Sequence, residues 1–229
     1  MRQIIFRITS SLLLLLFFVQ MSFAQLSAGV KIGRNLSSAN IDGLSVYKPN
    51  KEFLKASNLT VFVSIPLKNG FSFQPEISYH ENGFIIKETR DIKLFNIAVP
   101  VGASAHTHIK NVQVPLLMQY TFGKNLIGGY VNIGPFVNYA TSGEVKTMAH
   151  AIIDFNVATT PINLNNKNFE KLGAGLMGGA GLWIKAGHGR ILTEVFYQQA
   201  MTDSFADPII DIKLKNKSLG FNVGYAYNF

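Results

Sequence analysis

The sequence predicts an all-β protein, an eight-stranded antiparallel up-and-down transmembrane β-barrel, and three observations lead to this prediction. Apolar and polar residues alternate with a period of two in successive segments, as in strands with one apolar face. The connections between these segments are alternately short and long. The chain ends on an apolar strand face at Phe229. Since only a closed sheet satisfies every backbone group in hydrocarbon, we expect the last strand to pair with the first.

The first 24 residues predict a secretory signal peptide. Arg2 and Arg7 precede an apolar run over 12–19, and small residues lie at the positions before Ala24 that a signal peptidase inspects. This run is too short to span a bilayer, so we expect cleavage between Ala24 and Gln25. A single barrel domain then covers 25–229, and with no cysteine in the chain it is expected to lack disulfides and lipid attachment.

Eight segments have the strand pattern, and they cover 28–35, 59–65, 71–80, 112–122, 131–139, 172–185, 191–197 and 217–229. Connections after the second, fourth and sixth are a few residues long, whereas those after the first, third, fifth and seventh have about 15 to 30 residues. Short inner turns and long outer loops alternate in this way when both termini of a membrane barrel are periplasmic. We therefore expect the cell outer membrane, with periplasmic N- and C-termini.

The last strand carries apolar or aromatic residues at alternate positions from 219 to 229. It is similar to the closing strand of outer-membrane barrels, in which the barrel-assembly machinery reads a C-terminal aromatic residue. That likeness implies an assembly signal at Tyr225, Tyr227 and Phe229, with the machinery and outer-membrane lipid as partners. An amphipathic strand ending a soluble sheet is the alternative. Aromatic residues beside the short turns favour the membrane, namely Phe71, Phe73, Tyr120, Phe122 and Tyr130.

Short motifs on four predicted strands are shared with a known family. They are 29–35, 73–76, 114–117 and 134–135, followed by the aromatic ending. On these the sequence resembles the small outer-membrane β-barrel domain proteins of the Bacteroidota that are labelled PorT-like, over essentially all of 25–229. The resemblance implies barrel architecture rather than an activity. Some relatives are linked to protein secretion across the outer membrane. Our overall expectation is an interaction or envelope-structural role, for which a secretion or surface assembly is one setting.

The strand face assigned to the lumen carries a predicted polar network of Lys31, Glu76, His80, Lys185 and Glu194. Buried charges in a narrow barrel are expected to pair with one another, because an unpaired buried charge is costly. A lipid-modifying enzyme using Ser78 and His80 is the alternative. Since residues two apart on a strand are about 6 to 7 Å apart, these side chains need not touch, and we predict no catalytic residue.

Bulky side chains share this lumen face, at Phe62, Leu117, Phe136, Met177, Trp183, Leu192 and Phe196. Side chains nearly fill an eight-stranded barrel, so we expect no conduction, and a narrow passive pore is the alternative. Pro75, Pro115 and Pro135 lie inside strands. Each removes a backbone donor, so we expect bulges there, near a membrane boundary.

The outer loops 82–110 and 142–170 are more apolar than loops usually are. We expect strands that extend beyond the membrane and a protein partner that contacts them. His106 and His108 have no third ligand nearby, so no metal, cofactor or nucleic acid is expected. Without Arg2 and Arg7 of the predicted signal, the 21 basic residues become 19 against 13 acidic ones, a net charge of +6. This charge suits anionic phosphates at a membrane surface, but scattered solvated lysines explain it equally, and we prefer this second interpretation.

Overall fold

The computed structural model describes residues 26–42, 50–94, 97–150, 154–164, 169–203, 205–207 and 212–229. The predicted signal segment, with Ala24 and Gln25, lies outside these residues. The main strands are β1 (Ser27–Asp42), β3 (Leu54–Pro66), β4 (Phe71–Leu94), β5 (Ile97–Lys124), β6 (Ile127–His150), β8 (Leu172–Ala186), β9 (Gly189–Ala200) and β11 (Ile212–Asn228). No helical segment within the described ranges has the length and apolarity of a membrane span.

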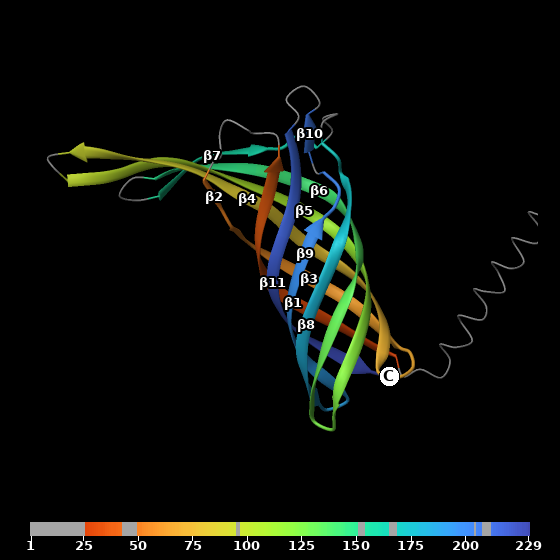
Figure 1. Ribbon diagram of the computed structural model, residues 1–229. Helices are drawn as coiled ribbons and strands as arrows, with labels where there is room; N and C mark the ends of the chain where they lie inside the picture. The colour runs from red at the N-terminus through yellow and green to blue at the C-terminus, as the bar shows by residue number, and fades with distance from the viewer. Residues whose placement is uncertain are drawn as a thin grey trace, which may run out of the picture.

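The main strands form a closed barrel (Figure 1). Each pairs antiparallel with the next in chain order, and β1 pairs with β11 from Ser27–Asn228 to Asp42–Lys213. Beyond the last pair, the Phe229 backbone nitrogen donates a hydrogen bond to the Leu26 oxygen over 2.9 Å. Among the described residues, eight strands therefore make the ring, which confirms the predicted fold class.

Burial alternates along the strands as the period of two predicts. In β3 nearly every second side chain is buried, and the residues between them, such as Val61, are exposed. Ile77 and Ile133 are 62% and 65% exposed on the outer wall, whereas Leu117, on the inner face, is completely buried. An apolar outer wall of this extent suits hydrocarbon rather than water.

The short turns lie at the end of the barrel where the chain terminates (Figure 1). Asn69 and Gly70 have φ values of 59° and 83°, a pair of positive angles that suits a tight hairpin and that Asn-Gly adopts readily. Asn125 has a φ of 67° in the next turn. The local sequence thus closes these hairpins tightly and leaves the opposite end for the longer connections.

The prolines do not produce the expected bulges. Pairing across Pro75, Pro115 and Pro135 is interrupted for two residue pairs each time, yet the same register resumes on the far side. Leu116 on β5 lies opposite Pro75 of β4 and, if the register is continued, opposite Pro135 of β6. Both prolines therefore lie in the middle of the wall rather than at its boundary. A proline lacks a backbone donor but keeps an extended φ, so the ladder loses hydrogen bonds without needing an extra residue.

A sheet continues beyond the barrel at the end opposite the short turns. The β4–β5 pairing runs on to Leu94–Ile97, and the β5–β6 pairing to Gly102–His150. The short strands β2 (Asn50–Glu52) and β7 (Asp154–Pro161) pair with β4 and β6, and β10 (Phe205–Asp207) pairs with β11. We call β2, β7, residues 84–94 of β4 and the segments of β5 and β6 that pair alongside them the outer sheet. Figure 1 shows it projecting sideways. Much of the predicted outer loops is therefore strand.

Candidate functional site

A buried ion-pair cluster lies inside the barrel. The Lys31 Nζ donates to the Glu76 Oε1 over 2.7 Å and to both carboxylate oxygens of Glu194 over 3.2 Å. The three residues come from β1, β4 and β9, and none is more than 2% exposed. Because a buried charge without a partner is strongly destabilising, this pairing binds three strands together at one level of the lumen.

Neutral donors complete the cluster. The Asn132 and Asn222 amides donate to Glu194 over 2.9 Å and 3.0 Å, and the Tyr130 hydroxyl donates to it over 3.3 Å. The Gln74 amide donates to Glu76 over 2.7 Å. These donors stabilise the charged carboxylates and add β6 and β11 to the set of joined strands.

His80 belongs to a second polar group rather than to the ion-pair cluster. Its Nε2 accepts a hydrogen bond from the Gln198 amide over 2.9 Å, and the Gln113 amide donates to the Gln198 oxygen over 3.0 Å. The group joins β4, β5 and β9 through uncharged contacts. The ring nitrogen that accepts from Gln198 is thereby engaged in a structural hydrogen bond.

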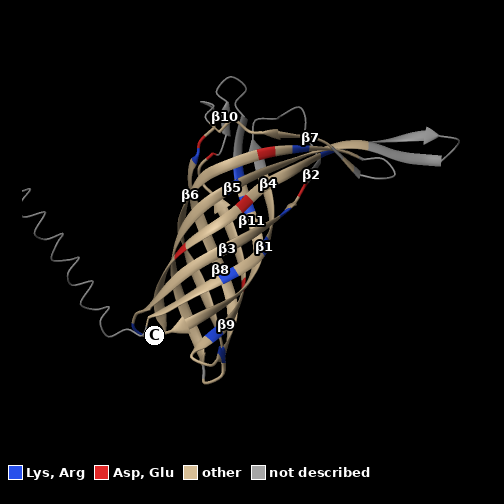
Figure 2. Cartoon of the chain, turned by 180° about the vertical axis from the view of Figure 1, so that it is seen from behind, with Lys and Arg blue, Asp and Glu red and all other residues tan. Residues whose placement is uncertain are grey.

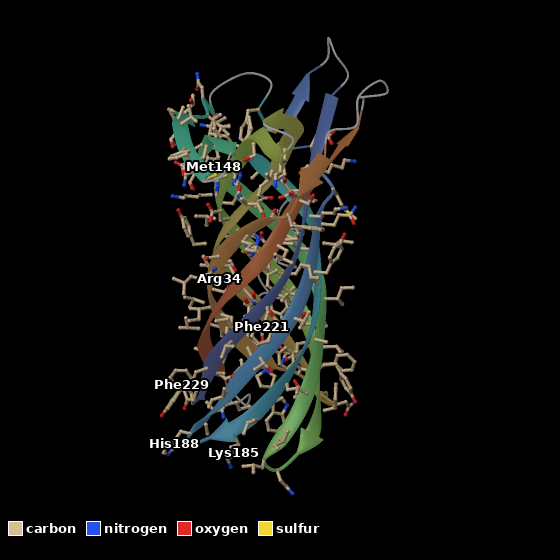
Figure 3. The ribbon with its side chains drawn as sticks, turned by 90° about the vertical axis from the view of Figure 1, so that its left-hand side faces the viewer. Arg34, Met148, Lys185, His188, Phe221 and Phe229 are labelled. Carbon is tan, nitrogen blue, oxygen red and sulfur yellow. The ribbon has the colours of Figure 1, made fainter. Side chains whose placement is uncertain are left out.

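Lys185 does not join either group. By the alternation of β8, Lys185 occupies a position of inward parity, meaning that it shares the strand face that points into the lumen. Its side chain is nevertheless exposed, because Lys185 lies at the end of the strand, just before the Gly187 turn. Figure 3 shows Lys185 beside His188 at the short-turn end. The expectation that Lys185 reaches the lumen network is therefore corrected.

Ser78 and His80 do not form a nucleophilic pair in the described structure. The Ser78 hydroxyl shares a hydrogen bond of 2.7 Å with Thr60, while His80 contacts Gln198. On β5, the His106 Nε2 lies 2.9 Å from the Ser104 hydroxyl, and the His108 Nδ1 lies 2.9 Å from Glu81. Within the described ranges no three His, Cys, Asp or Glu side chains gather as a metal site.

Apolar side chains fill much of the remaining lumen. Leu117, Phe136, Met177 and Phe196 form a buried cluster. Towards the short turns, the Arg190 guanidinium lies 5.0 Å from the Trp183 ring. A recess of about 30 Å³ lies beside Lys31 and Arg190, with room for no more than a few waters. Phe62 and Trp183 are buried as well, and Leu192 is half-buried beside the recess, so the predicted inward direction of the bulky residues is confirmed.

Sequence reasoning missed the neutral members of both polar groups. Asn132, Asn222 and Tyr130 all occupy alternate strand positions that face inward, which is a signal in the sequence. The placement of Tyr130 among the aromatic residues of the membrane interface is therefore wrong, because its side chain is buried in the lumen. Parity does not say which strand positions lie at the same height, since that depends on the register between strands. Their contact with Glu194 therefore emerges only from the three-dimensional structure.

The model of a family described as "Outer membrane protein beta-barrel domain" matches residues 20–206. The chain belongs to this family. With the closed ring and its apolar outer wall, the match shows an outer-membrane β-barrel.

Solved structures of small barrels are similar to the chain. Neisserial surface protein A has 10% identity and a TM-score of 0.48, covering 89% of this chain and 97% of its own. OprG from Pseudomonas aeruginosa has 15% identity and a TM-score of 0.48, covering 90% and 97%. Ail of Yersinia pestis has 13% identity and a TM-score of 0.39, covering 89% and 99%. No role follows from similarities of this level, and no curated protein matches the sequence.

Proposed function

We propose that this outer-membrane barrel binds a partner protein outside the cell, and that the outer sheet makes the contact. The observation that carries the proposal is the continuation of β4, β5 and β6 well past the point where the barrel wall is complete. A barrel needs only about 9–11 residues per strand to cross a membrane. β5 has 28 residues, so a large part of it serves something other than the membrane span.

The β7 strand offers a suitable binding edge. It pairs with β6 on one side, and the described part of the chain places no strand on its other side. Phe155 and Val157 are 58% and 64% exposed there. An extended segment of a partner can add to such an edge through main-chain hydrogen bonds, while apolar side chains provide specificity.

The lumen, as far as the described residues show it, supports this proposal because its charged groups pair with one another. Its His80–Gln198 group is hydrogen-bonded, and Leu117, Phe136, Met177 and Phe196 pack together. We therefore propose a non-enzymatic role in interaction or envelope structure. A lipid-modifying activity lacks an assembled Ser78–His80 pair among the described contacts. A narrow passive pore is disfavoured by the buried cluster of Leu117, Phe136, Met177 and Phe196 in the lumen.

We also propose the orientation and processing that the sequence predicts. The signal peptide is removed between Ala24 and Gln25, both termini face the periplasm, and the outer sheet faces the exterior. The position of the C-terminus beside the short turns supports this orientation (Figure 1). Membership of the PorT-like proteins and a place in a secretion or surface assembly follow from the sequence resemblance and complete the proposal.

A crosslinking experiment tests the partner site, and the absence of native cysteine makes it clean. Single-cysteine variants V157C, on the β7 edge, and N125C, in a short turn, are expressed in the native host and exposed to a thiol crosslinker. We expect a discrete protein adduct with V157C and none with N125C. Equal adducts at both positions, or none at V157C in cells where the barrel is folded, contradict the proposal.

The same two variants test the orientation. A polyethylene-glycol maleimide too large to cross the outer membrane is added to intact cells. Reaction is expected at V157C in intact cells, and at N125C only after the outer membrane is permeabilised. The reverse pattern places the outer sheet in the periplasm and overturns the orientation.

A further inference from the structure

A group of basic residues lies on the outer wall, close to the end that carries the outer sheet. Arg34 on β1, Lys55 on β3 and Lys217 on β11 point outward by the alternation of their strands, and we call them the basic cluster. The three strands are adjacent, with β1 in the middle. Figure 3 shows Arg34 projecting from the wall, further from Phe229 than Phe221 is.

Strand pairing places Arg34 and Lys55 next to each other, while Lys217 lies opposite Ser38, four residues further along β1 than Arg34. Leu36 lies opposite Lys55 on one side and opposite Leu219 on the other. Arg34 precedes Leu36 by two residues on the same face, so Arg34 and Lys55 are diagonal neighbours, about 7–8 Å apart at the backbone. Lys217 stands in the same relation to Leu36. The surface therefore combines three positive charges with two exposed leucines.

The charges of the basic cluster are not neutralised by nearby carboxylates. No ion pair joins Arg34, Lys55 or Lys217 to any acid in the described ranges. Two acids lie close to this rim, since Asp203 contacts Lys215 at 4.0 Å and Glu81 contacts His108 at 2.9 Å. By the Asn58–His80 pairing, Glu81 lies near Lys55, and a hydrogen bond to histidine does not remove its negative charge. The three cations outnumber this carboxylate, so the outward surface keeps a net positive potential.

The height of the basic cluster matches a membrane boundary. On β1, the stretch from Ala28, where the apolar wall starts, to Leu36 contains nine residues. A tilted strand crosses the hydrocarbon in about 9–11 residues, so the cluster lies where acyl chains give way to headgroups. Figure 2 shows both basic and acidic residues at this end of the barrel, and further basic residues near the short turns.

We propose that the basic cluster binds the phosphate groups of phosphorylated lipids in the outer leaflet, which rests on the orientation proposed above. The Arg34 guanidinium can donate two parallel hydrogen bonds to a phosphate, and the lysine ammonium groups attract the phosphate as point charges. Leu36 and Leu219 lie against the acyl chains of the same lipid. The combination selects a lipid over a soluble anion, because a free phosphate gains nothing from the leucines.

The test uses the full mature protein in nanodiscs or micelles of phosphatidylcholine with added phosphatidic acid. Bound lipids are counted by native mass spectrometry on heat-modifiable, hence folded, protein. The double variant R34S/K55S is compared with K68S/K185S, which removes the same charge from exposed positions at the short-turn end. We expect the wild type and K68S/K185S to retain phosphatidic acid alike, and R34S/K55S to bind it about tenfold less or weaker still.

Two outcomes overturn the proposal. Equal retention by R34S/K55S and K68S/K185S shows that the basic cluster has no special role. Displacement of the lipid by inorganic phosphate at equal concentration shows that a free anion, not a lipid, is the ligand. The lipid count depends neither on the outer sheet nor on the direction of insertion. Its failure can therefore be told apart from a failed crosslink at V157C and from a reversed orientation.

Discussion

Lys31 shows how much of the lumen depends on one side chain, because among the described residues it is the cation that pairs with both buried carboxylates, Glu76 and Glu194. Replacing it with a neutral residue leaves Glu76 and Glu194 close together without their cation. We expect Lys31→Met to lower the free energy of unfolding by about 3–5 kcal/mol, measured by urea unfolding in lipid vesicles.

Two further variants separate this effect from a general loss of charge. Lys68→Met, in an exposed turn, should change the stability by less than about 0.5 kcal/mol. The triple variant K31M/E76Q/E194Q should recover part of the loss, since no uncompensated charge remains in the lumen. A Lys31→Met protein as stable as the wild type is incompatible with a tightly paired ion cluster.

At the scale of single residues, the sequence predicts the face of each side chain but not its height. Parity correctly directs Lys31, Glu76 and Glu194 inward, and desolvation explains why they meet. The same parity directs His80 and Lys185 inward, yet one joins a separate amide group and the other lies in solvent at a turn. Height depends on register and strand tilt, which a single strand does not encode.

At the scale of the strand, β11 completes the ring by pairing with β1, and the sequence predicts an assembly signal at its end. Its terminal Phe229 continues the outer apolar face, with its ring centroid 5.2 Å from that of Tyr227. We expect Phe229→Asp to reduce the folded fraction in outer membranes far more than Asn228→Asp, because Asn228 has the inward parity. Heat-modifiable gel mobility measures that fraction, and equal yields from the two variants contradict an assembly signal at Phe229.

Pro135 marks a weak point in the ladder between β5 and β6. The position faces outward and is exposed, so a β-branched residue fits there while restoring a backbone donor. We expect Pro135→Val to raise the free energy of unfolding by about 1 kcal/mol. The same urea titration in vesicles checks this, and a less stable variant indicates that the proline relieves strain in the wall.

At this scale, the sequence predicts the eight strands of the wall but not how far they extend. Apolar residues in 82–110 and 142–170 indicate strands beyond the membrane. The pairing of β2 with β4 and of β7 with β6 comes from the three-dimensional arrangement, because these segments are short and lack a clear alternation of their own. The bulges expected at the prolines are wrong for a related reason, as a missing donor need not shift the register.

At the scale of the whole molecule, the role proposed above makes the barrel a filled support for the outer sheet. The ion-pair cluster, the amide group around Gln198 and the apolar cluster around Leu117 all lie within the lumen. Each is stabilised by contacts across the barrel. This arrangement is suited to holding a rigid sheet outside the membrane rather than to passing solutes.

Ion conductance in planar lipid bilayers tests this central claim most directly. Purified protein, shown by heat-modifiable mobility to be folded, is inserted and recorded under an applied voltage. Because packed side chains leave no continuous water column, we expect no stable conductance steps from the wild type. Regular steps of constant size that disappear when the protein is unfolded would contradict a filled lumen and establish the barrel as a pore.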